Sequence, residues 1–592
     1  MLVHGDAKRR EGAAAMLRNV HDLLHGAFAA PRGLERHSTL VAALIEAGEL
    51  AQGVADAAFR AAGERDAATL AGDAAMALVV EVARCCGTSW ASGFEQDGAF
   101  PAAAYAQCIA LLADEPLEIS RPEGYAYYAL YPESYFEAAR HAAAARGPGH
   151  PVDWRVVGLR SIGTSLAAMV AAGLQAPLPR TLRPVGHPYD RQVCSTPPRP
   201  ADLAAAHAVV DEGPGRSGST LAAAARWLEQ AGVPTDRLHL FVSHDQGPGA
   251  EASPATRALW ARAPCHVVTF DALILDAARP AHRLDHWVAA VVGALGAPLR
   301  DLGGGAWRAL QHRSGALPPA HPWQERRKFL AEAASGRWLV KYCGLGREGL
   351  EKLARARTLA AAGFTPQPAG VCHGFLVERW RDDLLPLTWP WSGADRTALV
   401  EHVGAYLGLR ARCFPARPGS GATLAQLLEM GRHNSAEEFG SGAAAAWAHR
   451  ETGLDALEAR VRPVYTDNRM QSWEWLAGDG ALLKTDALDH ASGHDLVGCQ
   501  DIAWDVVGAG VEFALDESEV RHLATRTAAH SGHPVDEALC EFLRPCYLAF
   551  QLGAWREAQA AVGDAVEAAR LRAAADRYAA GLRAALGRPR CA

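Results

Sequence analysis

The spacing of apolar residues divides the chain into three regions, of which the first is predicted to be helical. Over residues 1–118 apolar side chains recur at helical intervals through 14–28, 40–59 and 69–85, whereas strand patterns are scarce. Glu49 and Asp56 fall on one face of the second helix. We interpret that face as solvated because carboxylates are mostly exposed in folded proteins, and we assign this region no chemistry.

Residues 119–290 carry short apolar runs that alternate with helical stretches. The runs at 156–159 and 208–210 are each followed by a glycine-containing turn and a helix, over 166–172 and 221–230. Further strand patterns lie at 238–243 and 266–270. This alternation predicts an α/β domain built on one sheet.

From residue 291 to residue 592 the pattern changes again. A stretch rich in glycine and proline at 303–325 is interpreted as a linker that opens a new domain. It is followed by a strand pattern at 337–342, a helical pattern at 347–361 and another strand at 374–380. The chain is therefore predicted to be a multidomain α/β and α+β protein.

Composition and charge narrow the classes of protein. The 592 residues are 49% hydrophobic and 21% charged, with a formal net charge of −7, which counts against a protein that mainly binds nucleic acid. No apolar run approaches the ~20 residues of a membrane span, and a signal-peptide pattern is lacking. We expect a cytoplasmic enzyme that acts on small molecules, with reduced cysteines and no membrane or nucleic-acid partner. Homo-oligomerisation is left open.

The most informative motif is the stretch His207–Thr220. Apolar residues 208–210 predict the end of a buried strand, and 221–230 predict the next helix, so the loop between them caps a helix N-terminus. Backbone N–H groups there point at an anion, and Asp211 with Glu212 suits the paired hydroxyls of a ribose. These residues predict a ribose 5-phosphate site, whereas a glycine-rich turn alone is more often ordinary strand-to-helix structure.

The motif resembles the signature of the type I phosphoribosyltransferases, in which an apolar run, two acids and a Thr/Ser-Gly-x-Thr loop bind phosphoribosyl pyrophosphate (PRPP). The resemblance implies that Asp211 and Glu212 hold the ribose hydroxyls and that residues 215–220 surround the 5-phosphate. The family's loop usually contains no proline, whereas Pro214 is present here.

Two further segments acquire a role through the same resemblance. Residues 156–165 repeat the order of strand, glycine turn and helix, and the family's loop at this place cradles pyrophosphate, here with Arg160. The basic stretch 183–191 would form the flap of the fold, with Arg183 and Arg191 as pyrophosphate clamps or, equally well, as solvated surface residues. The implied PRPP-binding residues are Arg160, Ser161, Gly163, Thr164, Arg183, Arg191, Asp211, Glu212, Gly215, Arg216, Ser217, Gly218, Ser219 and Thr220.

The C-terminal region carries a second resemblance, to the N-lobe of a kinase. A strand lysine, Lys341, a helix glutamate, Glu351, and the strand that carries Glu378 follow the order of that lobe. The resemblance implies that these three residues bind ATP, with the lysine neutralising phosphates and the helix glutamate fixing the lysine. A solvated lysine on an edge strand is the alternative for Lys341.

Later motifs resemble the aminoglycoside phosphotransferase-like, or choline-kinase-like, small-molecule kinases. Residues 500–506 are similar to the family's Asp-Pro-x-Trp-Asp run, and by this resemblance Asp505 braces the catalytic loop. The same resemblance makes Asp467 the catalytic base and Asp486 the magnesium ligand, and it implies a two-lobed domain.

The chain departs from this kinase pattern around the base. Tyr465-Thr466 replaces the family's His-Gly, and Ser472 replaces an asparagine that binds a second metal ion. Asn468 and Glu474 are the candidates to substitute for that asparagine.

The two resemblances together imply a bifunctional enzyme. The middle domain would transfer ribose 5-phosphate from PRPP to a small-molecule acceptor, with Arg160 neutralising pyrophosphate and Asp211 or Glu212 moving the proton. The C-terminal domain would phosphorylate a small molecule, with Asp467 orienting the acceptor towards ATP and Mg²⁺ as cofactor. Two alternatives stay open: a PRPP-sensing regulatory or binding protein, and an active phosphoribosyltransferase joined to an inactive kinase-like domain.

Overall fold

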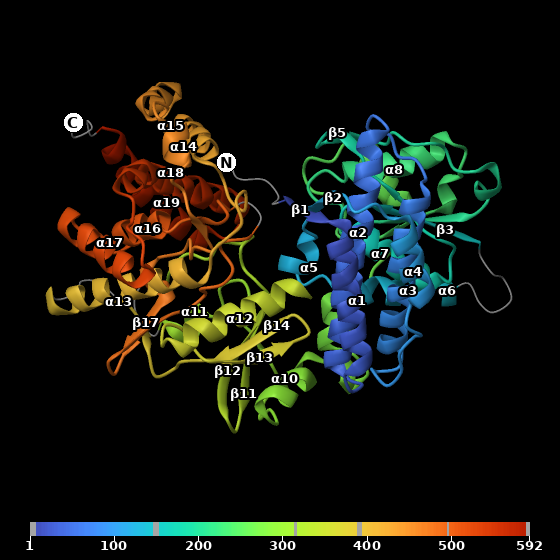
Figure 1. The fold of residues 1–592 in the computed structure, drawn as a ribbon, viewed down its shortest axis with the longest axis horizontal. Helices are drawn as coiled ribbons and strands as arrows, with labels where there is room; N and C mark the ends of the chain where they lie inside the picture. The colour runs from blue at the N-terminus through green and yellow to red at the C-terminus, as the bar shows by residue number, and fades with distance from the viewer. Residues whose placement is uncertain (1–7, 146–152, 313–316, 388–392, 494–495, 588–592) are drawn as a thin grey trace.

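The computed structural model describes residues 8–145, 153–312, 317–387, 393–493 and 496–587. These residues form two halves that lie side by side, one drawn in blue to green and the other in yellow to red (Figure 1). Among the described residues, every helix is too short or too polar to span a bilayer.

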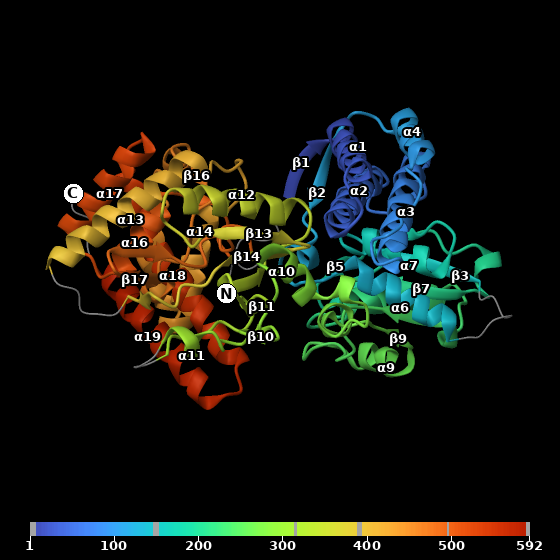
Figure 2. The ribbon, with the colours of Figure 1, turned by 90° about the horizontal axis from the view of Figure 1, so that it is seen from below.

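The helices predicted near the N-terminus are confirmed, and a small sheet that the sequence did not predict lies at their edge. Strands β1 and β2 pair in antiparallel fashion. Helices α1 to α3 pack on one another, and α3 packs on α7 of the following region, as Figure 2 shows from below. The elements are β1 (Lys8–Gly12), α1 (Ala13–Ala29), α2 (Leu34–Ala61), α3 (Leu70–Ala91), α4 (Ala102–Leu111) and β2 (Pro116–Ser120).

The middle region contains the predicted α/β sheet, with five parallel strands in the order β4-β3-β7-β8-β9. Side chains alternate between its two faces: Val156 and Ala208 join the core under α6 and α7, whereas Val157 and Val209 join the core under α8. The elements are α5 (Glu123–Tyr127), α6 (Pro132–Ala144), β3 (Trp154–Leu159), α7 (Gly163–Leu174), β4 (Arg180–Leu182), β5 (Val185–His187), β6 (Asp190–Gln192), β7 (Ala206–Val210), α8 (Ser219–Gln230), β8 (Leu238–Phe241), α9 (Pro254–Arg262), β9 (Cys265–His266) and α10 (Leu284–Val292).

The strand order creates a switch point between β3 and β7. The chain leaves β3 towards β4 on one side and returns to β7 on the other, so the loops after β3 and after β7 diverge at the same edge of the sheet. Open α/β sheets bind their ligands in the crevice at such a point. Both loops that the sequence singled out lie at this switch point.

The remaining chain contains a five-stranded sheet and a helical lobe. The sheet has the order β10-β11-β12-β14-β13, and α12 links β12 to β13, which is the arrangement expected for the N-lobe. Its elements are β10 (Arg300–Asp301), α11 (Arg308–Gln311), β11 (Lys328–Ala333), β12 (Gly336–Tyr342), α12 (Arg347–Ala361), β13 (Pro368–Cys372) and β14 (Phe375–Arg379).

The C-lobe is mainly helical, with short strands near the cleft that separates it from the N-lobe. Helices α18 and α19 pack along each other, as do α13 and α17. The elements are β15 (Leu385–Pro386), α13 (Gly393–Cys413), α14 (Leu424–Phe439), α15 (Leu454–Glu458), β16 (Pro463–Val464), β17 (Trp475–Gly478), β18 (Ala481–Lys484), β19 (Gln500–Asp501), α16 (Ala503–Glu512), α17 (Glu517–Ser531), α18 (Glu537–Ala561) and α19 (Ala565–Leu586).

The hydrophobic cores do not follow the three predicted domains. One core runs from Ala13 through the parallel sheet to Val340 and Val377 of the N-lobe, whereas the C-lobe has cores of its own. The predicted boundaries at 118 and 290 fall inside β2 and α10. The boundaries are therefore not breaks in the fold, because the elements on either side of each share buried apolar surface.

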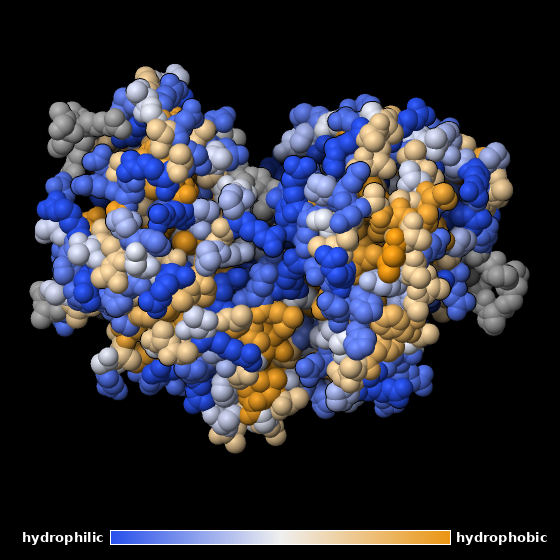
Figure 3. Space-filling model, viewed as in Figure 1, coloured by the Kyte–Doolittle hydropathy of each residue, from blue (hydrophilic) through white to orange (hydrophobic). Residues whose placement is uncertain are grey.

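The visible surface is mostly polar. Figure 3 shows apolar residues gathered over β13 and α10 at the lower centre of this face, and Val291 of α10 is among the exposed apolar side chains. The cysteines in the described part of the chain are all free thiols, as expected.

Candidate functional site

The loop after β7 has the predicted order of acids, turn and helix. Gly215 and Gly218 adopt φ values of +53° and +64°, which glycine accepts without steric cost, and α8 begins at Ser219. The hydroxyls of Ser217 and Ser219 donate hydrogen bonds to the carbonyl of Pro188, at 3.2 and 2.6 Å. Pro188 is in the turn between β5 and β6, so the predicted flap is present as a hairpin and lies on the loop.

The acidic pair is partly enclosed. Asp211 Oδ1 accepts a hydrogen bond from the N–H of Glu212 (2.8 Å), and burial raises the pKa of Asp211 to about 7. The Tyr135 hydroxyl donates to the carbonyls of both acids, at 2.8 and 3.0 Å. The Glu212 carboxylate lies against Gly124 of α5, where a Cβ atom would approach it to 3.0 Å. The pair therefore lies between the phosphate-type loop and α5.

Arg160, predicted to clamp pyrophosphate, is buried and paired with carboxylates in the structure. Its guanidinium is 1% exposed and forms ion pairs with Asp56 of α2, at 2.8 Å, and with Asp66. Arg183 also pairs with Asp56, and its backbone N–H donates to Asp66 at 2.7 Å. The helical region therefore supplies carboxylates that neutralise both arginines, and the interpretation of Asp56 as part of a solvated face is wrong.

The other face residue, Glu49, is buried as well, and it pairs with Arg9 at 2.7 Å. The face of α2 that carries the acids is thus turned inward, which helical spacing alone does not reveal because it gives the phase of a helix and not its partner.

The remaining predicted PRPP residues lie around the switch point and differ in their burial and in their hydrogen-bond partners. Gly163 approaches the end of β7 so closely that a Cβ atom would lie 2.8 Å from the Val210 carbonyl oxygen. Arg191 donates to the carbonyl of Gly186 within its hairpin (2.6 Å), and Arg216 is exposed. Ser161 and Thr220 are half-buried, and Thr164 is buried with no hydrogen-bond partner for its hydroxyl among the described residues.

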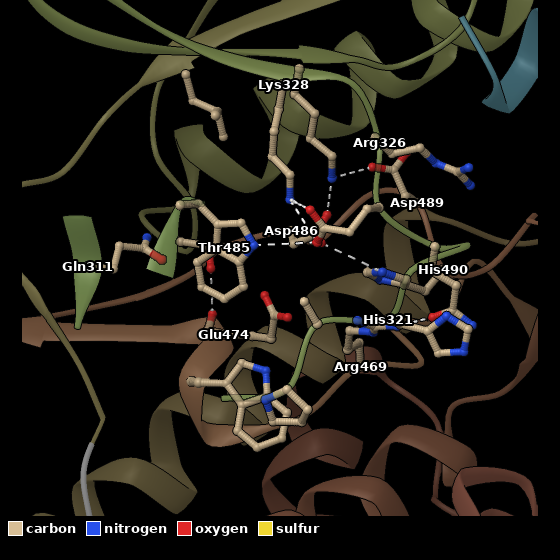
Figure 4. A pocket seen from close by; sticks show the side chains of 18 of the residues that line it. Gln311, His321, Arg326, Lys328, Arg469, Glu474, Thr485, Asp486, Asp489 and His490 are labelled. Carbon is tan, nitrogen blue, oxygen red and sulfur yellow. Dashed lines mark hydrogen bonds and ion pairs between the residues drawn. The ribbon is translucent and has the colours of Figure 1, made fainter. Parts of the chain in front are cut away.

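The cleft between the two lobes of the C-terminal half gathers charged side chains from distant segments (Figure 4). Lys341 of β12 forms ion pairs with Asp486, 145 residues further on, and with Asp489 at 2.6 Å. Burial alone would lower the pKa of Lys341, but the two carboxylates outweigh it and raise the pKa. The predicted ATP lysine and metal ligand therefore meet in one cleft.

Two further carboxylates line this cleft. Glu378 of β14 has a pKa raised to about 7 by burial, and so has Glu474. The backbone carbonyl of Glu474 accepts a hydrogen bond from the N–H of Thr485 (2.8 Å), which holds Glu474 beside Asp486. Carboxylate oxygens are the ligands that Mg²⁺ takes in proteins, so Asp486 with Asp489 fits a magnesium ion chemically.

Glu351, predicted to bind ATP, is not among the residues that line the cleft. Its side chain is 45% exposed and lies 3.7 Å from Arg355 one turn along α12. The neighbouring residue, Lys352, points inward instead and pairs with Asp489 at 2.7 Å. One residue is about 100° around a helix, so the carboxylate next to Lys341 comes from the loop after β18 and not from α12.

The structure also places Asp467 outside the cleft. Its side chain is fully buried, accepts a hydrogen bond from the Tyr406 hydroxyl and lies 3.4 Å from Lys484 Nζ. Asp505 braces this loop as predicted, because it accepts the backbone N–H groups of Asp467 and Asn468, at 2.6 and 2.9 Å. In this arrangement Asp467, predicted as the catalytic base, is buried and paired, so it would have to give up these partners to take a proton from a substrate.

Asn468 does not replace the missing metal ligand either. Its side-chain amide donates to the carbonyls of His490 and Gly498, at 2.8 and 2.9 Å, and so holds the loop. Asn468 and Glu474 were the candidates to substitute for the family's asparagine, which Ser472 replaces. Of the two, Glu474 alone lines the cleft.

The segment interpreted as a linker, residues 303–325, is part of the cleft in its described portions. Arg308 pairs with Glu567 of α19 at 2.9 Å, and the N–H of Ala320 donates to the same carboxylate at 2.8 Å. The segment thus crosses from the N-lobe sheet to the C-lobe, and Trp307 and Trp323 line the cleft. Glycine and proline content marked the segment as irregular but did not reveal this anchoring.

Several residues of the cleft were missed by the sequence analysis. Asp489 follows the predicted metal ligand Asp486 by three residues, and this spacing was the signal that could have identified a second carboxylate in the cleft. The missed lining residues are Lys328, Trp380, Arg469, Trp473, Asp489 and His490.

Comparisons with known proteins give similarity to solved structures alone. No protein-family model and no curated protein matches it. A choline kinase from Streptococcus pneumoniae is 14% identical, with 43% of this chain and 89% of that chain covered and a TM-score of 0.30. A choline/ethanolamine kinase family protein from Mesorhizobium loti is 15% identical, with 50% and 98% covered and a TM-score of 0.30.

A Plasmodium vivax ethanolamine kinase is 11% identical, with 44% of this chain and 79% of that chain covered and a TM-score of 0.28. Because these identities and scores are low, the assignment of the cleft rests on its own residues.

Proposed function

We propose that the C-terminal half binds a magnesium–nucleotide complex in the cleft between its lobes and transfers the terminal phosphoryl group to a small molecule. The observation that carries this proposal is the meeting of Lys341, Asp486 and Asp489 in the cleft. Binding of a nucleoside triphosphate requires a cation, here on a strand, and metal-binding carboxylates opposite it. Magnesium, when bound, neutralises charge on the phosphates.

The residues of the cleft divide the work of this reaction. Lys341, which holds the two aspartates together in the absence of ligand, turns to the phosphates when nucleotide enters. Glu474 takes the role of the base, since its carboxylate lines the cleft and its pKa near 7 suits proton abstraction at neutral pH. Asp467 supports the loop that carries the base.

Nucleotide binding by the purified chain tests this proposal. Isothermal titration calorimetry with a non-hydrolysable ATP analogue and Mg²⁺ should show binding to the wild type and none to Asp486→Ala. Glu351→Gln is the matched control and should bind as the wild type does, because Glu351 lies outside the cleft. Equal binding by the wild type and Asp486→Ala would contradict the site.

The sheet half supports a second candidate function, the binding of a phosphorylated ribose with transfer of its phosphoribosyl group. The specific observation in favour is that the acidic pair and both glycine-containing loops meet at the switch point of the parallel sheet. In this function the β5–β6 hairpin must lift from the loop first, because the carbonyl of Pro188 takes the hydroxyls of Ser217 and Ser219.

PRPP binding and pyrophosphate release separate the alternatives for this half. The double variant Asp211→Asn with Glu212→Gln should lose PRPP binding, whereas Asp486→Ala should leave it intact. Binding without pyrophosphate release, over a range of acceptors, would favour a sensor over a transferase. Unchanged binding by the double variant would remove the site from consideration.

A further inference from the structure

A cluster of two histidines and one glutamate lies outside both proposed sites. His37 is on α2, Glu133 is in the first turn of α6, and His373 is in the turn between β13 and β14. Their exposed fractions are 0%, 0% and 3%. His37 and His373 are 96 and 240 residues from Glu133 in sequence, so the cluster joins the helical region, the sheet half and the N-lobe.

The donor atoms of the three side chains converge on one point. His37 Nε2 and His373 Nε2 lie 2.8 and 2.9 Å from the same oxygen, Glu133 Oε1. All three donor atoms lie within 4.8 Å of one another. A zinc ion bound at ~2.0–2.1 Å in tetrahedral geometry separates its ligand atoms by about 3.3 Å, so small side-chain rotations suffice to admit an ion.

The surroundings orient both rings in the manner of metal ligands. The other ring nitrogens, Nδ1 of His37 and of His373, lie 3.0 Å from the hydroxyl oxygens of Ser89 and Ser38, respectively. Hydrogen bonds at the second nitrogen fix the tautomer and direction of a ligating histidine. The outward nitrogens are thus held by hydroxyls, and the inward nitrogens face the carboxylate.

The second oxygen of Glu133 is the independent sign of a missing ligand. Glu133 Oε2 is buried and has no hydrogen-bond partner among the described residues. Buried polar atoms are nearly always paired, and an ion between the three side chains would give this oxygen a partner. Hydrogen bonding of the two imidazoles to Oε1 accounts for the remainder of the cluster but leaves Oε2 unexplained.

We propose that His37, Glu133 and His373 form a structural site for a divalent transition-metal ion, zinc by preference, that fastens the N-lobe to the sheet half. Imidazole with carboxylate donors suits Zn²⁺ or Co²⁺ rather than Mg²⁺ or Ca²⁺, which take oxygen ligands. The site is structural because Glu133, bound through both of its oxygens, completes four donors, and because the ligands are sealed from solvent by rings that include Trp90, Phe94 and Trp287.

Metal content of the full-length chain tests the proposal. The wild type, purified without chelator, should contain one zinc ion per chain by mass spectrometry of the metal, and Glu133→Gln should contain none. The matched control is His282→Asn, since His282 is a buried histidine that stacks on Trp90 but belongs to no ligand set. That variant should keep its zinc.

A second measurement uses the wild type alone and therefore does not depend on the folding of Glu133→Gln. Removal of metal from the wild type by a chelator should lower the melting temperature, and added Zn²⁺ should restore it, because a ligand of the native state stabilises it. Co²⁺ in place of zinc should give visible absorption. A wild type that takes up neither ion and melts at the same temperature with zinc or chelator would overturn the proposal, as would full zinc content in Glu133→Gln.

Discussion

The two halves of the molecule hold their candidate site groups in opposite ways. At the parallel sheet the motif is close to its family pattern, yet Ser217 and Ser219 donate to Pro188 and Arg160 is held between carboxylates. In the C-terminal half the motif departs from the kinase pattern that it resembles, yet Lys341 and the acids around it line a cleft.

The difference shows that two things have separate causes: the presence of a motif, and the availability of its side chains to bind a ligand. Neighbouring residues set the motif, because a strand, a turn and a helix N-terminus are local structures. Availability depends on side chains from far away in the chain, here Asp56 for Arg160 and Tyr406 with Lys484 for Asp467. A group that is buried and paired does not bind substrate without losing its partner.

Separate replacement of the two candidate bases, Glu474 and Asp467, should have the largest effects and tests whether exposure in the cleft decides which of them is the base. Glu474→Gln should lower kcat for phosphoryl transfer by about 10²–10⁴-fold, the usual contribution of a general base, with the KM for ATP little changed. Asp467→Asn should instead lower stability, by about 3–5 kcal/mol, because it leaves Lys484 buried without its counter-charge. Steady-state kinetics and urea unfolding distinguish the two. A stable Asp467→Asn protein without activity would return the base role to Asp467.

Removing Asp56 tests how firmly the sheet half is closed. Asp56→Ala leaves Arg160 with Asp66 and removes the carboxylate that pairs with the Arg183 side chain, and breaking a buried ion pair costs about 3–5 kcal/mol. The loss should appear as a lower urea midpoint. Glu351→Gln, on an exposed face, is the control and should unfold like the wild type. An unchanged midpoint in Asp56→Ala would mean that the arginines are not held by this pair.

The pH dependence of phosphoryl transfer tests whether Glu474 is the base. Because burial raises its pKa to about 7, the carboxyl is protonated below that pH and cannot accept a proton. The kcat should therefore rise about tenfold per pH unit up to about pH 7 and level off above it. Glu474→Gln should lose this limb of the profile. Persistence of the limb in the variant would assign it to another group, such as Glu378, whose pKa is also raised to about 7.

The smallest effect concerns the flap. Replacing Ser217 and Ser219 together by alanine removes two hydroxyl donors to Pro188, each worth about 0.5–1.5 kcal/mol. Backbone amides of the β5–β6 hairpin should then exchange hydrogen faster in a deuterium-exchange experiment, while those of α8 should not change. Equal exchange in variant and wild type would show that other contacts hold the hairpin down.

The sequence predicted local structure well and long-range pairing poorly. The strand–loop–helix units around Arg160 and Asp211 follow from patterns within a few residues, whereas the N-lobe order around Lys341 and the bracing role of Asp505 came from a family resemblance; the structure contains all of them. The ion pairs of Arg160, 104 and 94 residues away, leave no local trace.

The rotational orientation of α12, meaning which of its side chains point inward, is another feature that the sequence does not determine locally. Glu351 and Lys352 are adjacent, both are common on helices, and only packing against the loop after β18 decides which one points inward. The junction of His37, Glu133 and His373 was likewise beyond the sequence analysis, because its members come from regions that it assigned to separate domains.

The continuous core from Ala13 to Val377 determines which parts of the molecule move as one. Since the N-lobe strands are buried together with α2 and the parallel sheet, Lys341 travels with the sheet half rather than with the C-lobe. Opening of the cleft would therefore move the helical lobe, α13 to α19, relative to Lys341, and segment 303–325 would have to bend between them because Arg308 is paired with Glu567 of α19. A truncated protein designed for expression should accordingly be cut after the N-lobe, near residue 380, and not at the start of it.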